Sequence, residues 1–468
     1  MKLSNLLAFI CAVVAFTFAS CDDDKSIRPD VVLPPNPTLD VSIISRTGTF
    51  EVIQQKTITL VGVLSNLDLS SSYTWKVNGV SQSSTDTVLN FSQPNTGEYT
   101  VEFIATNEFG TSSATVVITV KGKYQTGVYI LNEGSASTEM GSIIHIDADG
   151  DITPDAETVV NGNAFGVTAQ NMFFANGKIY VVSKSTDAEH LRRLVVLNAE
   201  TLKEVADYTN DLNTANVFSY QDNVGVIGDE IFLHAQSDVY SFHTVSKAIT
   251  LIKNGNVSAN YRMYTSKGKL FAVQGNTVKV FEAGKDTISM LMDFGAAVRS
   301  IARTDDGSIL VAVNKTPAEI HKINPADYSV TVNALSGATT TIGTGSGMGG
   351  IQVIYPKGND TIYFYSPSVS SPSIYQHVFS TNETTLIKNI TSFMPFTMNY
   401  GGIAISPKTG YVYVSTISGY GMAYRINAIT VIQFEKGNTP GANEIKTIKD
   451  YRDYTRFATG IYFPESYE

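Results

Sequence analysis

A strand-like motif recurs seven times between residues 127 and 413 and limits what this chain can fold into. In each copy a glycine or an Asn-Asp turn precedes alternating apolar residues, with an aromatic residue or leucine at the same phase. These anchors are Tyr129, Tyr180, Phe232, Phe271, Leu310, Tyr363 and Tyr413. Successive anchors lie 51, 52, 39, 39, 53 and 50 residues apart. One four-stranded propeller blade takes about 40–50 residues, so the sequence predicts seven blades over residues 122–468.

The two ends of the repeat array predict how the ring closes. The seventh unit opens with Gly401–Pro407 before its anchor strand, and Thr459–Pro464 repeats this piece with no anchor strand after it. The first unit has its anchor strand at 128–131 but only a linker before it. We therefore expect residues 461–463 to pair beside Tyr129 and complete the first blade. Closure of this kind leaves only short strand edges exposed.

Composition supports an all-β fold and excludes two classes of protein. Of the 468 residues 43% are hydrophobic and only 16% charged, so disorder is excluded, because the chain can bury enough apolar surface. Val, Ile, Thr, Tyr and Phe dominate after the N-terminus, as in strands. The net charge is −10 and no Lys/Arg run occurs, which argues against a nucleic-acid partner.

The first 37 residues are typical of an exported and tethered protein. The uncharged apolar run from Leu6 to Phe18 is shorter than the roughly 20 residues of a membrane span, so residues 1–20 are predicted to be a signal peptide. Phe18-Ala19-Ser20-Cys21 resembles the lipobox of bacterial lipoproteins, which implies acylation of Cys21 and a lipid anchor. The Asp22–Asp24 tract is similar to the surface-export signal of lipoproteins from anaerobic Gram-negative gut bacteria. Residues 21–37, rich in proline, are then a stiff tether.

Residues 38–121 are predicted to form a separate β-sandwich. Short alternating segments such as 57–61, 73–77 and 115–120 are separated by turn residues, including Asn78-Gly79. With Trp75 on the third strand and Tyr99 after the Thr96-Gly97 turn, this segment resembles a PKD or immunoglobulin-like domain. That resemblance implies a core position for Trp75, the only tryptophan.

The start of the repeat array carries a second resemblance. Residues 127–134, Gly-Val-Tyr-Ile-Leu-Asn-Glu-Gly, followed by Gly141-Ser142-Ile143, resemble the opening of surface lipoprotein propellers related to YVTN-repeat and surface-layer-type proteins. One branch of that group binds cobalamin and delivers corrinoids to outer-membrane transporters. The resemblance implies an outer-membrane, cell-surface location and makes a corrinoid and such a transporter the partners to test.

The sequence offers no catalytic, metal or cofactor motif. The histidines occur singly, and no Gly-x-Ser-x-Gly elbow is present. In the acidic run 147–151 the glycine is fourth instead of sixth, so a hairpin fits better than a calcium loop. We therefore predict no catalytic residues, no metal and no cofactor.

The candidate ligand contacts lie in loops that propeller topology brings to the central channel. Their tyrosines and arginines supply flat contact area with hydrogen-bonding tips, which suits a ligand held in a concave face. The candidates are Asn132, Glu133, Phe165, Arg192, Tyr220, Tyr261, Arg262, Arg299, Tyr400 and Tyr420.

These observations predict a non-catalytic cell-surface protein that binds a nutrient, either a corrinoid or a glycan, or a protein partner on the loop face. Two alternatives stay open. The propeller could be a hydrolase or lyase acting on a lactone or a polysaccharide, because propeller sites draw residues from many blades. It could also be a purely structural scaffold of the envelope.

Overall fold

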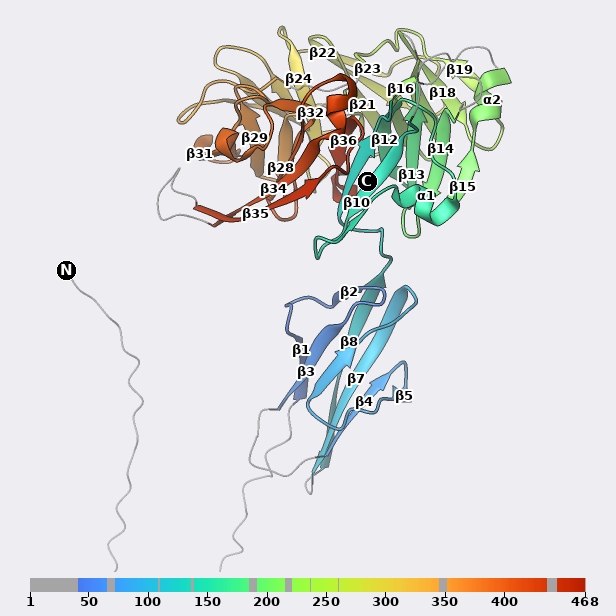
Figure 1. Cartoon of the computed structure of the whole chain (residues 1–468), viewed down its shortest axis with the longest axis vertical. Helices are drawn as coiled ribbons and strands as arrows, with labels where there is room; N and C mark the ends of the chain where they lie inside the picture. The colour runs from blue at the N-terminus through green and yellow to red at the C-terminus, as the bar shows by residue number, and fades with distance from the viewer. Residues whose placement is uncertain are drawn as a thin grey trace, which may run out of the picture. The chain divides into compact units, whose positions relative to one another are not determined.

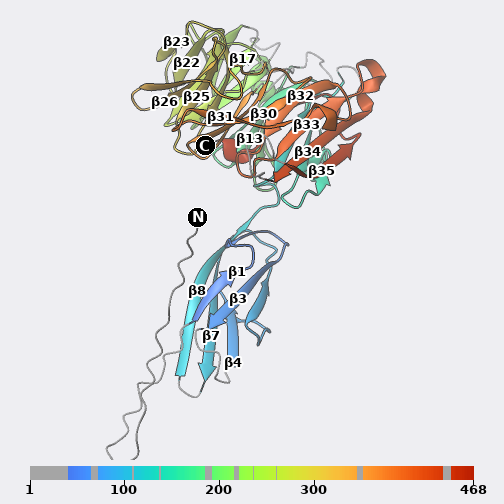
Figure 2. The same cartoon turned by 90° about the vertical axis from the view of Figure 1, so that its left-hand side faces the viewer.

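The computed structural model describes ten stretches of the chain, 41–64, 72–107, 110–135, 139–184, 192–214, 221–235, 237–259, 261–344, 352–435 and 444–467. They form two compact units built almost entirely from strands, which confirms the all-β class (Figures 1 and 2). The predicted signal peptide, Cys21, the tether and Tyr220 lie outside the described residues.

The strands before Gly122 form a β-sandwich of two sheets. One sheet has the order β1 (Val41–Ser45), β3 (Ile58–Leu64) and β6 (Val88–Phe91). The other has the order β2 (Glu51–Ile53), β8 (Gly110–Lys121), β7 (Gly97–Asn107), β4 (Ser72–Val77) and β5 (Val80–Ser81).

Large side chains fill the space between the two sheets. Trp75 and Phe103 are fully buried, with ring centroids 4.6 Å apart, and Trp75 Nε1 donates to the carbonyl of Asp86 at 2.9 Å. Gly62 on the opposite sheet lies under the Phe103 ring, where an added Cβ would overlap the ring atoms. The core position predicted for Trp75 is confirmed.

The described residues from Val128 onward form seven four-stranded sheets, the blades of a propeller. From the inner strand outward, blade 1 consists of β36 (Ala458–Tyr462), β9 (Val128–Asn132), β10 (Ser142–Ile146) and β11 (Ile152–Thr153). Blade 2 consists of β12 (Ala169–Ala175), β13 (Lys178–Ser183), β14 (Leu194–Asn198) and β15 (Glu204–Asp207). Blade 3 consists of β16 (Gln221–Ile227), β17 (Glu230–Ala235), β18 (Asp238–His243) and β19 (Ile249–Leu251).

The remaining blades follow the same plan. Blade 4 consists of β20 (Tyr264–Ser266), β21 (Lys269–Gln274), β22 (Thr277–Glu282) and β23 (Met290–Asp293). Blade 5 consists of β24 (Val298–Arg303), β25 (Ile309–Val313), β26 (Glu319–Ile323) and β27 (Val330–Ala334). Blade 6 consists of β28 (Ile354–Lys357), β29 (Thr361–Ser366), β30 (Ser373–Val378) and β31 (Glu383–Asn389). Blade 7 consists of β32 (Met398–Ile405), β33 (Val412–Ile417), β34 (Asn427–Glu435) and β35 (Glu444–Arg452).

Short helical segments are confined to the connections. They are α1 (Ala156–Asn161), α2 (Thr209–Thr214), η1 (Thr391–Phe393), η2 (Gly421–Arg425) and η3 (Pro464–Ser466). No helix in the described stretches is both long and apolar enough to cross a membrane.

Every predicted anchor falls in the second strand of its blade, from Tyr129 in β9 to Tyr413 in β33. The interval varies because the loops between strands differ in length, while the strand order repeats. Apolar residues on both faces of these strands pack between neighbouring blades, since a single sheet cannot bury both faces alone. The seven-bladed prediction is confirmed.

The C-terminal strand closes the ring as predicted. β36 pairs antiparallel with β9, placing Ile461 opposite Ile130 and Tyr462 opposite Tyr129. The Tyr462 hydroxyl donates to Asn171 Oδ1 of blade 2 at 3.0 Å, and Phe463 packs on Tyr413 of blade 7 with centroids 5.7 Å apart. The last strand therefore joins the first blade and contacts both of its neighbours.

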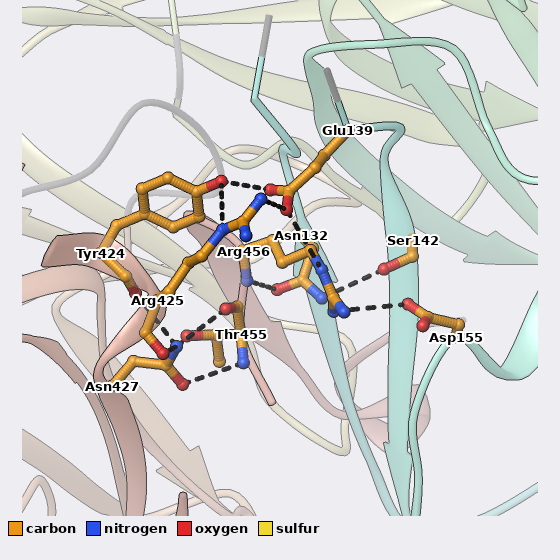
Figure 3. A network of polar contacts seen from close by, with 9 residues as sticks. All are labelled: Asn132, Glu139, Ser142, Asp155, Tyr424, Arg425, Asn427, Thr455 and Arg456. Atoms are coloured by element: carbon orange, nitrogen blue, oxygen red, sulfur yellow. Dashed lines mark hydrogen bonds and ion pairs between the residues drawn. The ribbon is translucent and has the colours of Figure 1, made fainter. Parts of the chain in front are cut away.

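A polar network reinforces the seam between blades 7 and 1 (Figure 3). Glu139 accepts a hydrogen bond from the Tyr424 hydroxyl and another from Arg425 Nη2 at 2.8 Å, and its Oε1 lies 3.8 Å from Arg456 Nε. The backbone N–H of Arg456 donates to Asn132 Oδ1 at 3.0 Å. Residues distant in sequence are thus tied together where the ring closes.

Candidate functional site

A β-bulge recurs in the innermost strands at the end where the second strand of each blade finishes. Pairing registers shift between Ala169 and Asn171, Gln221 and Asn223, Val298 and Ser300, and Ala458 and Gly460, with a longer irregularity from Asn399 to Ile403. Bulges bend a strand and redirect a side chain. The residues within these irregularities include Gln170, Asp222, Arg299, Tyr400 and Thr459. We call this end of the ring, which also carries the second-to-third strand loops, the channel mouth.

Glu133 connects three blades at the channel mouth. Its Oε2 accepts a hydrogen bond of 2.7 Å from the Tyr400 hydroxyl of blade 7. Its Oε1 accepts one of 3.1 Å from Gln170 Nε2 of blade 2. Burial raises the pKa of the Glu133 carboxyl, while the Tyr400 hydrogen bond and the charge of Lys184 counteract this effect. The carboxyl group is therefore held in one orientation beside a cation.

Lys184, Asp222 and His234 extend this arrangement into blade 3. Lys184 Nζ lies 3.9 Å from Asp222 Oδ2, beyond hydrogen-bond distance, and its side chain is 15% exposed. Asp222 Oδ1 is hydrogen-bonded to His234 Nδ1, and both side chains are buried. We call Tyr400, Glu133, Gln170, Lys184, Asp222 and His234 the mouth row.

Several buried polar atoms at the channel mouth have no hydrogen-bond partner within the described part of the chain. Gln170 Oε1 and His234 Nε2 belong to the mouth row, and Ser183 Oγ and Arg299 Nε lie at the same level of their blades. Buried polar groups are normally satisfied, so each of these atoms retains an unused capacity for a hydrogen bond.

An aromatic cluster lies next to Glu133 on blades 7 and 1. Tyr400 is 5.0 Å from Phe457 and 6.3 Å from Tyr420, measured between ring centroids, and Tyr424 stacks on Phe457 at 4.3 Å. Tyr420 is 65% exposed, whereas Tyr424 is buried. The cluster therefore has a fixed base and one ring presented outward.

Arg262 spans the interior of the ring. Its Nη1 donates to Gln352 Oε1 of blade 6 at 2.6 Å, and Nη2 donates to the carbonyl of Ile461 in blade 1. The guanidinium carbon lies 4.0 Å from the centroid of Tyr462. This buried side chain braces blade 4 against the far side of the ring and forms part of its interior.

The structure brings together three of the ten predicted contact residues, Glu133, Tyr400 and Tyr420. Arg299 is half-buried on the mouth side of blade 5. Arg192 is instead bound to the outer strand of its blade, through Glu204 and Asp207, and donates to the Ala164 carbonyl at 2.6 Å.

The other predicted residues have structural contacts. Phe165 lies in the hydrophobic core, Asn132 is buried and donates to Ser142 Oγ at 3.1 Å, and Arg262 is the brace described above. Tyr261 is partly buried, and its carbonyl accepts a hydrogen bond from Asn223. Only Tyr220 is outside the described residues.

The sequence reasoning missed Gln170, Lys184, Asp222 and His234. One signal was available, because Gln170-Asn171 and Asp222-Asn223 lie 52 residues apart, the same interval as the anchors Tyr180 and Phe232. A polar pair repeated in register with the blades marks equivalent inner-strand positions.

Metal ligation has no geometric support in the described stretches. They contain no group of three or more His, Cys, Asp or Glu side chains that could hold a metal ion. In the acidic run, Asp147 Oδ1 accepts hydrogen bonds from the backbone N–H groups of Asp149 and Asp151 at 3.0 and 2.8 Å. The run thus forms a turn between β10 and β11, as expected for a hairpin.

The fold and the channel mouth define the chain as a seven-bladed β-propeller protein preceded by a β-sandwich. Comparison with protein families gives the particular family. Residues 126–465 match the model described as a domain of unknown function, DUF5074, and the chain belongs to this family. A search of curated proteins finds no match.

Three solved structures with a similar fold have low sequence identity to this chain. A quinonprotein alcohol dehydrogenase-like protein from Bacteroides thetaiotaomicron is 14% identical, with 88% of this chain and 96% of that chain covered and a TM-score of 0.49. A hypothetical selenium-binding protein from Sulfolobus tokodaii is 8% identical, with coverages of 72% and 93% and a TM-score of 0.47. Virginiamycin B lyase from Staphylococcus aureus is 12% identical, with coverages of 62% and 92% and a TM-score of 0.37.

Proposed function

We propose that this protein is a non-catalytic cell-surface lipoprotein that binds a nutrient, a corrinoid or a glycan, or a protein partner at the channel mouth. The observation that carries the proposal is the mouth row. Four blades contribute side chains to it, and hydrogen bonds from Tyr400 and Gln170 fix Glu133 between blades 7 and 2. Polar groups held on strands and joined to an aromatic cluster are typical of recognition sites.

The rigidity of the site supports binding. Gln170 and Asp222 project from bulges in strands that are paired on their outer side, so their positions are set by the blades and not by long loops. A preorganised site loses little conformational entropy when a ligand binds. Tyr420 adds an exposed aromatic surface beside it.

The lipoprotein part of the proposal rests on the N-terminal sequence. Acylation of Cys21 after removal of residues 1–20 would anchor the chain to the outer membrane, and residues 22–37 would serve as the tether to a PKD-like sandwich. At the cell surface the propeller would present its ligand to an outer-membrane transporter. Globomycin treatment, which blocks lipoprotein signal cleavage, should leave an uncleaved precursor; a normally processed chain would contradict lipidation.

Calorimetric titration of the full chain in detergent tests the binding function. Cyanocobalamin and a panel of glycans are titrated separately, and we expect saturable heat with one of them. Heat that persists unchanged after mutation of Glu133 to Ala would place binding elsewhere. If no compound binds, the small-molecule form of the proposal fails; copurification from crosslinked cells then separates a protein partner from a purely structural role.

A catalytic function is the second candidate, and the Asp222–His234 pair favours it. A carboxylate on Nδ1 orients an imidazole and leaves Nε2 free to accept a proton, as in hydrolases. Lactones and polysaccharides would be the substrates of such a hydrolase or lyase. Product formation that disappears in Asp222→Asn would support this candidate over simple binding.

A further inference from the structure

We propose that the mouth row recognises vicinal hydroxyl groups of a neutral carbohydrate, an inference that rests on the proposed binding function and names its ligand class. Its basis is the combination of unfilled acceptors, one cation and an adjacent exposed aromatic ring.

Two buried acceptors of the mouth row have no partner among the described residues. Gln170 uses its amide nitrogen on Glu133, which leaves Oε1 without a partner in the described part of the chain. His234 uses Nδ1 on Asp222, which leaves Nε2 in the same condition. Both side chains are at least nine-tenths buried, so each open position carries a desolvation cost that a hydrogen-bonding partner removes.

Lys184 places a cation beside the acidic residues of the mouth row. Lys184 approaches Asp222 only to 3.9 Å, and its charge also acts on Glu133. The ammonium group has three hydrogen-bond donors and makes no close hydrogen bond to Asp222. It can therefore donate a hydrogen bond to an oxygen atom of a ligand. A ligand group that fits the mouth row therefore donates a hydrogen bond to one of its acceptors and accepts a hydrogen bond from Lys184.

Hydroxyl groups meet both demands, because each donates one hydrogen bond and accepts two. A vicinal pair can donate to an imidazole, amide or carboxylate acceptor and accept from Lys184 at the same time. The two carboxylates, Glu133 and Asp222, disfavour an anionic ligand by like-charge repulsion. That condition separates a neutral sugar from an acidic saccharide.

Tyr420 presents an aromatic ring beside the mouth row. Tyr420 is 65% exposed and packs edge-on against Tyr400, whose hydroxyl donates to Glu133. The apolar face of a pyranose stacks on such a ring while its hydroxyls reach neighbouring polar groups. Because the contacts run from blade 7 through blade 1 to blades 2 and 3, the row is suited to an oligosaccharide more than to a single sugar.

The test titrates the full chain with neutral oligosaccharides of glucose, mannose, xylose and galactose, with the same compounds after periodate cleavage of their vicinal diols, and with cyanocobalamin. We expect a neutral compound to bind and its periodate-treated form to bind at least tenfold more weakly. The variant Lys184→Met should weaken binding about 10- to 100-fold, because a hydrogen bond to a charged group is lost.

Two further variants control this result. Lys322→Met removes a lysine that is paired with Asp306 at 3.1 Å on the outer part of blade 5, and it should leave affinity unchanged. Tyr420→Ala removes an exposed ring and should weaken binding even if Lys184→Met lowers the amount of folded protein. Equal affinity of wild type, Lys184→Met and Tyr420→Ala for the sugar would overturn the inference.

The outcomes separate this inference from the function on which it rests. Binding of cyanocobalamin or of an acidic saccharide, with none of a neutral sugar, would refute the inference and leave the binding function standing. Binding that survives periodate treatment would also refute it. Absence of binding by every compound would refute both the inference and the small-molecule form of the proposed function.

Discussion

The pH dependence of stability should change when Glu157 in α1 is replaced by glutamine. The residue is 1% exposed. Its Oε2 accepts a hydrogen bond from the backbone N–H of Ile143 at 2.7 Å, and its Oε1 accepts one from the Thr158 hydroxyl at 3.0 Å. Burial raises the pKa of Glu157 from 4.5 to about 7, more than these hydrogen bonds lower it. The folded protein therefore retains a proton that the unfolded chain releases.

The sign and size of the effect follow from this difference. Below pH 4.5 both states are protonated, and the full stability is present. As the pH rises from 4.5 to about 7 the unfolded state binds fewer protons than the folded state, so stability falls. A shift of this size corresponds to about 3 kcal/mol, at roughly 1.4 kcal/mol for each pH unit.

Urea unfolding at about pH 4 and about pH 8 measures this prediction. Glu157→Gln keeps an acceptor for Ile143 and cannot ionise, so it should match the wild type at low pH and exceed it by about 3 kcal/mol at high pH. The exposed Glu383→Gln serves as the matched control. Trp75, the only tryptophan, lies in the sandwich, so its fluorescence should follow an unchanged transition. A pH-independent difference between Glu157→Gln and wild type would refute the reasoning.

Three further predictions concern packing and the ring. Phe103→Ala should lower the free energy of unfolding of the sandwich by about 3–5 kcal/mol, measured by Trp75 fluorescence; a loss below about 1 kcal/mol would contradict a fully packed core. Arg262→Gln should destabilise the propeller by about 3 kcal/mol in urea unfolding, since its contacts to Gln352 and Ile461 are buried; an unchanged midpoint would show that the brace is dispensable. Arg456→Ala should cost about 0.5–1 kcal/mol at low salt and less in high salt; a salt-independent loss would mean that its ion pair with Glu139 contributes nothing.

The sequence predicted the architecture because the architecture repeats. An anchor such as Tyr180 or Phe232 follows its turn at the same phase in every blade. Residues 459–464 resemble an inner strand without an anchor strand after it, and the first blade was the one unit that lacked an inner strand. The alternation of polar and apolar residues along short strands likewise predicted the sandwich, and the large apolar side chain of Trp75 lies in its core. These are local patterns that strand geometry imposes on sequence.

The candidate site was less predictable because it depends on side chains distant in sequence. Glu133 and Tyr400 are 267 residues apart and meet only because the ring closes between them. Gln170 and Asp222 reach the channel mouth through bulges. A bulge of one residue appears in a sequence as a break in alternation, but β12 is buried on both faces and has no alternation to break. Phe165 shows the converse: its place in a loop between blades predicts a surface contact, but its side chain fills the core.

Closure of the ring determines whether the mouth row exists, and a disulfide between β9 and β36 tests it most directly. Residues directly opposite in an antiparallel pair have Cα atoms about 4.5–5.5 Å apart, within the range that a disulfide spans. Refolding of Ile130→Cys/Ile461→Cys under mild oxidation, followed by peptide mass spectrometry, should yield an intramolecular link between positions 130 and 461. The pair Ile130→Cys/Ile320→Cys, which joins blade 1 to blade 5, should yield none. Free thiols at 130 and 461 in the folded, oxidised monomer would contradict the closed ring.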